Sequence, residues 1–409
     1  MGSRESQTFP HKIAMVQLIV KHPWLGRLAL LATSAATLLL CIEMVIRIAG
    51  MDSSLLWQPD PYLGWSHIPG AKRHWTEEGD GWVEINALGM RDVERTVAKG
   101  HGVFRIAVFG DSVTEAVQVN VDQTFCQLLE SRLRARGIRA EVLNFGVNGY
   151  SPLQEYLLYQ THGKAFEPDV VIHAVFLDND VADGDRMLAS GDRGAPFIID
   201  SSSGTLTVDH SLAEASHRQY TRQPVFALRR VSATYRAVSA VRSAWRQRRF
   251  ASAATTSNTG IPRRYLLYET PVSDRWQRAW GGFERIVSQF AREVRAEGAN
   301  YVILSATAGQ IVNESAWTGL LDAYPAMRQR RWQLLAPDGR LRELATKEDV
   351  DLITSFEAFR RSAGQGQMFF GQVGHLTPLG HEIMAATVEE ALVGRGLLPL
   401  TSQAHLGEP

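Results

Sequence analysis

The 409-residue chain contains few cysteines, carries no net charge and shows none of the short motifs typical of metal or nucleotide sites. Two cysteines are too few for a disulfide scaffold or for a zinc site made of cysteine alone. Cys41 lies in an apolar stretch and Cys126 in a predicted helix, so we expect two unpaired thiols. The 43 basic and 43 acidic side chains balance, which argues against a nucleic-acid-binding protein because such proteins are usually strongly basic.

Motifs for bound cofactors are also missing. The sequence has no H-E-x-x-H or H-x-x-E-H pair and no carboxylate triplet at metal spacing, so we predict no metal. It has no G-x-G-x-x-G turn and no P-loop, so we predict no nucleotide and no cofactor. We expect structural roles for His162, His173 and His381, the last in packing or capping. The 16 Phe and 10 Trp are enough for the core of one large domain with an anchor or an insertion.

The longest apolar stretch lies near the N-terminus. Residues 28–42 carry no charge, and the apolar character continues to residue 49 with only Glu43 and Arg47 interrupting it. A helix over 28–49 is long enough to cross the ~30 Å hydrocarbon core, and Glu43 and Arg47 can pair on one of its faces. We interpret it as a transmembrane signal anchor, because no A-x-A-like cleavage site follows. A cleaved signal peptide and a buried helix are the alternatives.

Charges beside this stretch predict its orientation. Four basic residues precede it, with Glu5 as the only acid among them: Arg4, Lys12, Lys21 and Arg27. The other side opens with Asp52 and Asp60 and has no basic cluster before Lys72. By the positive-inside rule, residues 1–27 are cytoplasmic and the rest of the chain is periplasmic or extracellular.

The remaining chain divides into a lead-in and a main domain. Residues 51–102 are rich in Trp, Pro and Gly, and we predict a small β-rich lead-in. The main domain, residues 103–400, alternates strands with helices, which predicts a parallel sheet with helices on both sides. The expected strands are 104–109, 141–144, 169–176 and 301–305, and the expected helices are 122–136, 153–163, 273–298 and one after Pro378.

An insertion at about residues 183–264 breaks this alternation. No Asp or Glu occurs between Glu214 and Glu269, and eight arginines lie between Arg222 and Arg249. Apolar residues recur there every three or four positions, which predicts a basic amphipathic helix. It either rests on anionic lipid headgroups or an acidic glycan, or it is a lid helix with a solvated arginine face. Residues 251–260 (ASAATTSNTG) are predicted to be a flexible linker.

Four short polar stretches lie at or after the ends of predicted elements, where ligands bind in open parallel sheets. Residues 110–112 (GDS) place a serine hydroxyl at a helix start, near free backbone amides. Residues 144–149 (NFGVNG) offer a backbone N–H beside a glycine, and residues 178–180 (DND) offer a side-chain amide. Residues 374–381 (GHLTPLGH) supply an imidazole before the last helix.

Together and in this order, the four stretches resemble the SGNH/GDSL hydrolase family. The resemblance is to its membrane-anchored members, which have a lead-in like DPYLGW (60–65) and INALGMRD (85–92), and it covers residues 60–397 apart from the insertion. It implies an α/β fold, a three-layer α/β/α, flavodoxin-like arrangement with a parallel sheet, preceded by one N-terminal transmembrane helix.

The resemblance also implies the catalytic residues. Ser112 resembles the nucleophile, and its N–H one donor to the oxyanion. Gly146 resembles the glycine whose N–H is the second donor, and Asn179 the asparagine whose amide is the third. His375 resembles the general base. These roles are chemically reasonable, because a serine hydroxyl needs a base and a tetrahedral intermediate needs preorganised donors.

Two positions depart from the family pattern. The family usually has an aspartate two or three residues before the histidine, where this chain has Val373 and Gln372. Gln372 can accept an Nδ1–H bond, but it cannot offset the imidazolium charge. A Ser–His dyad, an acid recruited from elsewhere and a weakened enzyme are therefore open alternatives. Asp178 replaces a frequent glycine, and its carboxylate would repel an oxyanion if it pointed inward.

The sequence therefore predicts a serine ester hydrolase at the outer face of a membrane. Its expected partners are an acyl-ester substrate, either a lipid or an acylated glycan, and the membrane itself through the N-terminal helix, with no nucleic acid. One alternative is an O-acetyltransferase or O-acetyl esterase acting on cell-envelope polysaccharide. Another is a catalytically weakened glycan-binding domain.

Overall fold

The computed structural model describes residues 23–48, 55–189, 194–199, 206–223, 225–239, 242, 260–371 and 374–399. The chain divides into two compact units. One contains Met1–Ser53 and Ala227–Trp245, and the other contains Ser54–Phe226 and Arg246–Pro409.

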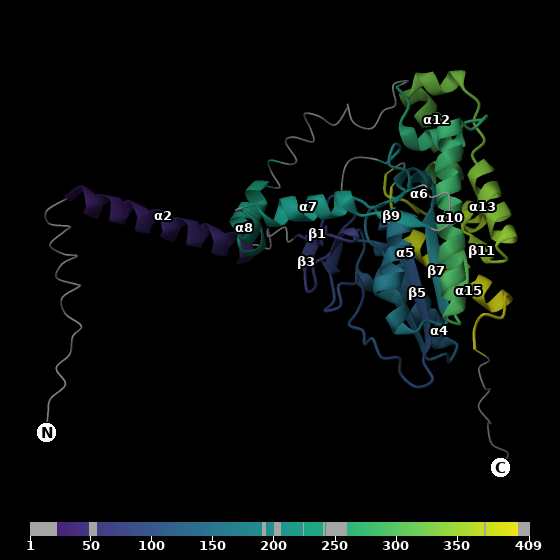
Figure 1. The fold of residues 1–409 in the computed structure, drawn as a ribbon, viewed down its shortest axis with the longest axis horizontal. Coiled ribbons are helices and arrows are strands. Elements are labelled where there is room, and N and C mark those ends of the chain that lie inside the picture. Colours follow the sequence, from purple (N-terminus) through teal and green to yellow (C-terminus); the bar gives the residue numbers. More distant parts are fainter. Residues whose placement is uncertain are drawn as a thin grey trace, which may run out of the picture. The chain divides into compact units, whose positions relative to one another are not determined.

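The larger unit is built on a five-stranded parallel sheet (Figure 1). Its strands are β5 (Phe104–Gly110), β6 (Ala140–Asn144), β7 (Val170–Phe176), β10 (Asn300–Ala306) and β11 (Asp351–Thr354). They lie in the order β11-β10-β7-β5-β6, and every adjacent pair is parallel. The chain therefore runs outward from β5 to β6 and then returns past β5 to β7. This reversal is the topological switch point at which flavodoxin-like sheets bind ligands.

Helices cover both faces of the sheet. Alternate residues of β5 point to opposite sides: Ile106 and Val108 belong to one hydrophobic core, Ala107 and Phe109 to the other. The first core is closed by α4 (Phe125–Ala135), α14 (Phe356–Arg361) and α15 (Pro378–Gly394), and the second by α5 (Pro152–Thr161), α10 (Asp274–Ala296) and α13 (Ala336–Lys347). The predicted three-layer α/β/α fold is confirmed.

The predicted elements of the main domain agree with the structure to within a few residues, but the helices α12 (Glu314–Ala323), α13 and α14 were not expected. The helix expected over 122–136 begins with a short 3-10 turn (Val121–Gln123), and α4 starts only after Thr124, whose side chain accepts the N–H of Gln127 at 3.4 Å. The fifth strand, β11, was not expected, because its four residues are too short to show a period. The other short helices here are α3 (Ser112–Glu115), η2 (Gly163–Phe166), α6 (Leu177–Asp183), η3 (Arg263–Tyr268), α11 (Gly309–Val312) and η4 (Pro325–Gln329).

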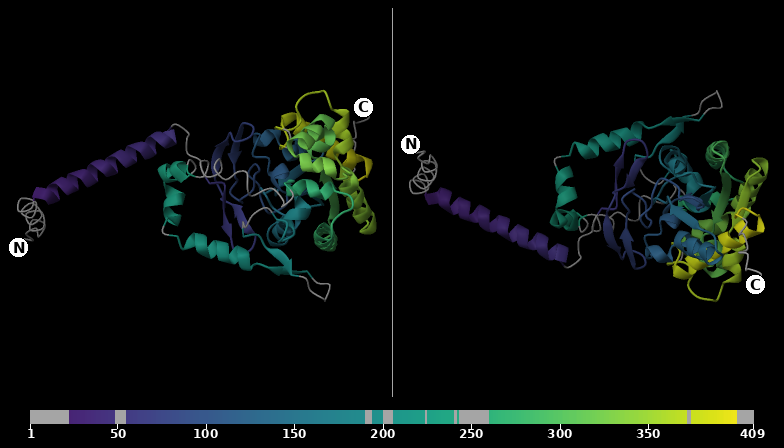
Figure 2. Two further views of the ribbon diagram at one scale, coloured as in Figure 1. Left: turned by 90° about the horizontal axis from the view of Figure 1, so that it is seen from above. Right: turned by 90° about the horizontal axis from the view of Figure 1, so that it is seen from below.

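The lead-in forms two antiparallel hairpins, β1–β2 (Trp57–Asp60, Gly64–His67) and β3–β4 (Lys72–Trp75, Gly81–Glu84). Figure 2 shows these strands, in dark blue, on the opposite side of the domain from the green and yellow helices of the C-terminal half. Leu56, Val83 and Ile85 form a small core with Val117, which lies just after α3. The lead-in is therefore packed against the segment that carries the GDS turn.

The Arg-rich part of the insertion, for which one amphipathic helix was expected, contains two short helical segments in its described residues. The insertion contains the hairpin β8–β9 (Phe197–Ile199, Thr207–Asp209), α7 (Ser211–Thr221) and α8 (Phe226–Val231), followed by helical residues 233–239. Ser232 separates the last two, because its Oγ accepts the N–H of Tyr235 at 3.1 Å and so starts a new helix. The predicted linker, apart from Gly260, lies outside the described residues.

The N-terminal helix α2 (Pro23–Ile48) begins five residues before the predicted span and ends within one residue of it. Its Trp24–Ile48 segment is long and apolar enough to cross a membrane, by length and composition, a test that a signal sequence also passes. Apolar side chains are exposed along its whole length, from Trp24 to Ile48.

Candidate active site

The GDS turn lies at the C-terminal end of β5, where the chain passes directly into α3. Asp111 caps this short helix, since its Oδ1 accepts the N–H of Val113 at 2.9 Å. Gly110 is required here because a Cβ would collide with the Thr114 side chain and press on the carbonyl oxygen of Ala174. Ser112 is the first residue of α3 and is partly exposed, so its hydroxyl stands at the sheet edge.

His375 reaches Ser112 from the far end of the chain. Its Nε2 lies 2.9 Å from the Ser112 Oγ. The loop that carries it is held by antiparallel contacts with the preceding segment, in which Phe370 donates its N–H to the His375 carbonyl at 2.8 Å. The two residues that the sequence predicted as nucleophile and base are therefore in direct hydrogen-bond contact.

Glu78, in the turn between β3 and β4, contacts the other ring nitrogen of His375. Its Oε2 pairs with His375 Nδ1, and both side chains are about 30% exposed. Gly374 leaves room for this contact, because a Cβ there would collide with the carbonyl of Phe370 and with Glu78. Nδ1–H then donates to Glu78, and Nε2 is left to accept the Ser112 proton.

The pKa values of the pair move as expected for an ion pair. Burial lowers the pKa of His375, but the hydrogen bond and charge of Glu78, helped by Asp111 and Glu115, outweigh it and leave the pKa raised. Burial raises the pKa of Glu78, but the hydrogen bond and charge of His375 reverse this and leave that pKa lowered. The site therefore has a carboxylate beside a histidine that holds its proton more strongly than usual.

Gln372, the residue predicted to orient His375, lies outside the described residues. Sequence reasoning missed Glu78, although it left open an acid from elsewhere in the chain. Glu78 is 297 residues from the histidine and belongs to an acidic turn (residues 76–80, TEEGD) of the lead-in. The cluster of acids in this turn, within a lead-in predicted only to be β-rich, was the only signal available.

Gly146, the expected second oxyanion donor, has its N–H occupied in the structure. Its N–H already donates to Asn144 Oδ1 at 2.9 Å. Gly146 is buried, and a Cβ on it would collide with the backbone of Thr114 and Glu115. This glycine is therefore needed for the close approach of α3 to the loop after β6, and it has no free donor.

Gly149, three residues later, has the N–H that this loop leaves free. From Phe145 to Ser151, every other backbone N–H has a partner within the described part of the chain. Gly149 is partly exposed and adopts φ +73°, a conformation that favours glycine. The N–H of Ser112 likewise has no partner among the described residues.

Asn179, in α6, is tied to the GDS turn. Its Nδ2 donates to Asp111 Oδ2 at 3.1 Å and to Asp183 Oδ2 at 3.2 Å. Asp111 is fully buried, and burial raises its pKa to about 6 despite the hydrogen bonds from Val113 and Asn179. The structure thus brings Asn179 to the turn that carries Ser112.

Asp178, the unexpected carboxylate beside Asn179, faces the protein core. It is 3% exposed, and its Oδ1 accepts hydrogen bonds from Tyr268 Oη at 2.9 Å and from Gln310 Nε2 at 2.8 Å. Burial raises its pKa to about 6. Its negative charge is therefore engaged by two core side chains.

Another buried carboxylate, Glu115, links the lead-in to the loop after β6. Glu115 Oε1 accepts Trp57 Nε1–H at 3.0 Å and lies 2.6 Å from His67 Nε2. Its Oε2 accepts the N–H of Asn148 at 2.8 Å, directly before Gly149. Glu115 is fully buried, and these three groups are its only hydrogen-bonding partners among the described residues. They hold the loop next to the free N–H of Gly149.

The other histidines have structural surroundings. His162 is exposed, whereas burial lowers the pKa of both His173 and His381 to about 3, so these two are neutral. His173 Nδ1 lies 2.5 Å from the Tyr301 hydroxyl in the core. His381 accepts the N–H of Phe125 at 3.2 Å and stacks on its ring, which agrees with the expected packing or capping role. No group of three His, Cys, Asp or Glu in the described residues is arranged to hold a metal ion.

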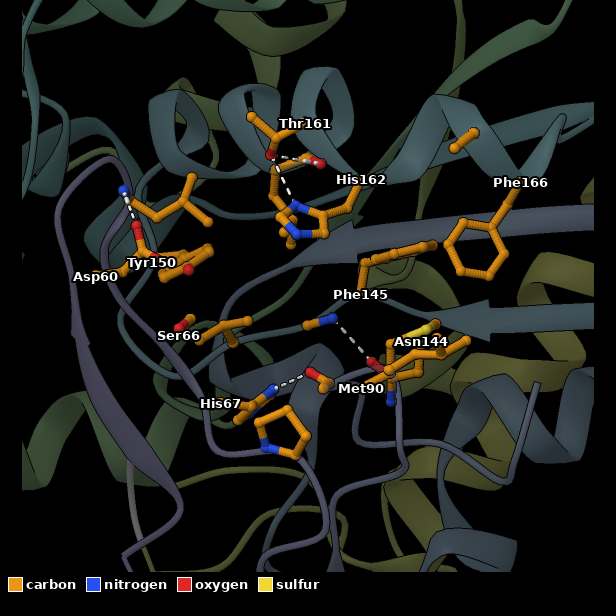
Figure 3. A pocket seen from close by; sticks show the side chains of 18 of the residues that line it. Asp60, Ser66, His67, Met90, Asn144, Phe145, Tyr150, Thr161, His162 and Phe166 are labelled. Atoms are coloured by element: carbon orange, nitrogen blue, oxygen red, sulfur yellow. Dashed lines mark hydrogen bonds between the residues drawn. The ribbon is translucent and has the colours of Figure 1, made fainter. Parts of the chain in front are cut away.

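Two cavities lie near these residues. One, of about 340 Å³, is formed between the lead-in and the α5–η2 segment, and the loop from Asn144 to Val147 makes one wall (Figure 3). Neither Ser112 nor His375 lines it. The other, of about 470 Å³, is bordered by residues 309–316 and 363–371, the second of which pairs with the His375 loop. Its polar wall includes Asn313, Glu314, Ser315 and Gln367.

Comparison with known proteins adds a family match. The model of the GDSL-like Lipase/Acylhydrolase family matches residues 108–383. No curated protein matches the chain. Among solved structures, the acetyl xylan esterase AlAXEase is 15% identical over 71% of this chain and 100% of its own, with a TM-score of 0.38. A lipase/acylhydrolase from Enterococcus faecalis is 12% identical (71% and 96% covered, TM-score 0.37), and TesA is 14% identical (72% and 99% covered, TM-score 0.38).

Proposed function

Because the chain belongs to the GDSL-like lipase/acylhydrolase family and is an ester-bond hydrolase, we propose that it uses a Ser112–His375–Glu78 triad. The observation that carries this proposal is the unbroken series of contacts from Ser112 Oγ to His375 Nε2 and from His375 Nδ1 to Glu78. It supports one of the three alternatives that the sequence left open, an acid recruited from a distant part of the chain.

In the first half of the reaction, Ser112 Oγ attacks the acyl carbonyl carbon while His375 Nε2 takes its proton. The imidazolium that forms is stabilised by the carboxylate of Glu78 at Nδ1. Nε2–H then protonates the leaving alkoxide, and an acyl-serine remains. In the second half, His375 takes a proton from water, the hydroxide attacks the acyl carbon, and Ser112 leaves with the proton returned from Nε2.

The oxyanion of each tetrahedral intermediate needs donors that stand ready before the reaction. We assign this role to the N–H of Ser112, the N–H of Gly149 and the side-chain amide of Asn179. The two backbone groups are supported by their lack of any other partner in the described residues. The amide is supported by its bond to Asp111, next to the nucleophile, and its 3.2 Å bond to Asp183 is long enough to be exchanged for a substrate oxygen.

The proposed location is the outer face of a membrane, with residues 1–27 cytoplasmic. It is supported by the length and apolar character of α2 and by the basic residues that precede it.

A polar acylated alcohol, such as an O-acylated glycan, is the second candidate substrate besides a lipid ester. It is favoured by the polar cleft beside the His375 loop, where Asn313, Glu314 and Gln367 offer hydrogen-bonding groups. If a sugar hydroxyl replaced water in the second half of the reaction, the same residues would carry out O-acetyl transfer.

The experiment that tests the proposal is hydrolysis of p-nitrophenyl acetate and longer p-nitrophenyl esters by the full chain in detergent. Ser112→Ala is expected to abolish turnover, because it removes the only atom that forms the acyl-enzyme. Wild-type activity that persists in Ser112→Ala would overturn the assignment. Adding an acylated sugar and a free sugar acceptor, and comparing acid release with acyl transfer, distinguishes hydrolase from transferase.

A further inference from the structure

The charged pair at the end of α2 makes specific contacts with the distant insertion, and both segments belong to the same compact unit. Glu43 Oε1 accepts the N–H of Ala233 at 2.7 Å, and Oε2 accepts the N–H of Thr234 at 2.9 Å. The hydroxyls of Ser232 and Thr234 add bonds to Oε2 at 3.1 and 2.9 Å. Glu43 thus receives four hydrogen bonds at the N-terminus of helical residues 233–239, where a negative charge is stabilising.

Arg47 makes the complementary contact one turn further along α2. Its Nη2 donates to the carbonyl of Val231 at 2.6 Å, and its Nε donates to Glu43 Oε1 at 2.9 Å. Val231 is the last residue of α8, so the arginine lies at a helix C-terminus. Arg47 therefore lies at the C-terminus of one insertion helix and Glu43 at the N-terminus of the next. At each helix end, that sign of charge is stabilising.

These contacts fix where the insertion lies along α2. Glu43 and Arg47 lie in its last two turns, so residues 231–234 are level with the end of the apolar span. A carboxylate near that boundary is costly unless it is paired, and the insertion supplies the bonds that α2 alone lacks. The bonds between Glu43, Arg47 and the insertion would have no function if α2 were cleaved from the mature protein.

The insertion helices expose apolar side chains beside this boundary. Leu228, Val231 and Val238 are 44%, 65% and 63% exposed. In the same unit, Val45 and Ile48 of α2 are 59% and 80% exposed. The surrounding sequence has no acid from residue 215 to residue 268 and is rich in arginine.

We propose that residues 228–239, docked on a retained α2 by Glu43 and Arg47, lie on the membrane surface and bind anionic lipid headgroups. The proposal rests on the membrane location given above. Exposed valines and leucine that adjoin a membrane span are suited to the boundary between headgroups and acyl chains. The arginine-rich sequence of residues 215–268, which contains no Asp or Glu, is suited to anionic lipids. A soluble acidic glycan would use the arginines and leave the apolar side chains in water, which is why we choose the lipid.

The test uses the full chain in vesicles, with a fluorophore attached at Val238→Cys in a Cys41→Ser background. Cys126 is fully buried and unreactive, and the exposed Lys347→Cys is the matched labelling control. A quencher attached to lipid chains is expected to reduce the fluorescence of the label at 238 at least about threefold more than that of the label at 347. Quenching at 238 is expected to increase as phosphatidylglycerol is added to the vesicles. Equal quenching at the two sites overturns the proposal. The proposal is also overturned if a soluble acidic polysaccharide, and not the vesicles, shields the label at residue 238.

The docking step is tested by Glu43→Gln in the same labelled protein. This change removes the charge that faces the backbone amides of Ala233 and Thr234, so lipid quenching at 238 is expected to fall. Glu214→Gln, an exposed helix residue of the insertion paired with Arg218, is the matched control and should leave it unchanged. Hydrolysis of p-nitrophenyl acetate is measured in parallel, so failure of this proposal can be distinguished from failure of the catalytic one. Finding that the mature N-terminus begins after Ile48 would overturn this proposal without affecting the triad.

Discussion

The carboxylate of Glu78 pairs with Nδ1 of His375 across 297 residues of sequence. Glu78 lies in the β3–β4 turn, before the residues 108–383 that match the family model. The lead-in is therefore part of the site, since it supplies a charge that the loop before His375 lacks in every described position. Its second hairpin carries the acid of the proposed triad, and its first hairpin contacts Glu115 beside the loop that carries the proposed oxyanion donor.

Glu78→Gln is expected to lower kcat by about 10²- to 10⁴-fold with little change in KM. The amide can keep a hydrogen bond to Nδ1, but it cannot stabilise the imidazolium that forms during attack. The measurement is steady-state hydrolysis of p-nitrophenyl acetate. Glu77→Gln is the matched control, because Glu77 is adjacent, half-exposed and paired with Arg73 rather than with the histidine. Equal losses in the two variants would argue for a general effect on the turn.

The pH dependence of kcat/KM should report the ionisation of His375. The histidine must be neutral to accept the serine proton, so activity falls as the pH drops through its pKa. Because Glu78 raises that pKa, we expect the acidic limb of the wild type to lie above the ordinary histidine value of about 6.5. In Glu78→Gln the limb should move to lower pH, since burial, which lowers the pKa, is then opposed only by more distant charges. A limb that stays in place would contradict the proposed charge interaction.

The scaffold and the two central residues could be predicted because each has a local signal. The strands of the sheet are short apolar runs, and Ser112 and Asn179 directly follow such runs. His375 immediately precedes a well-marked helix start, since Thr377 caps α15 and Pro378 is its first residue. In a parallel sheet, these positions all come to the same edge, so a local pattern was enough to bring them together.

The proposed acid, Glu78, and the proposed oxyanion glycine, Gly149, could not be predicted in the same way. Glu78 contacts His375 through tertiary packing of the lead-in, which leaves no periodic pattern in the sequence. The stretch NFGVNG contains two glycines, Gly146 and Gly149. The sequence alone does not show which of their two N–H groups lacks a hydrogen-bond partner. The answer depends on the side chain of Asn144, which occupies the N–H of Gly146, and on the approach of α3, which requires a glycine there for steric reasons.

Glu115→Gln is expected to destabilise the fold by about 2–4 kcal/mol and to lower kcat. Glu115 accepts bonds from Trp57 and Asn148 and contacts His67, so an amide NH₂ group placed there must face another donor. Chemical denaturation gives the stability change. Glu84→Gln is the control, because the Lys72–Glu84 pair is exposed and should contribute less than about 1 kcal/mol. Comparable losses in both variants would show that burial of Glu115 is not the cause.

Gly146→Ala and Gly282→Ala should change stability in opposite directions. A Cβ at Gly146 meets the backbone of Thr114 and Glu115, which cannot move without displacing the nucleophile turn, so we expect a loss of several kcal/mol or failure to fold. A Cβ at Gly282, within α10, meets nothing within 4 Å, and alanine there should stabilise by about 0.5–1 kcal/mol through its higher helix propensity. Thermal unfolding of the two variants measures both effects. If Gly146→Ala were as stable as the wild type, the loop after β6 would be looser than the buried Asn144–Gly146 hydrogen bond implies. The N–H of Gly146 would then again become a candidate oxyanion donor.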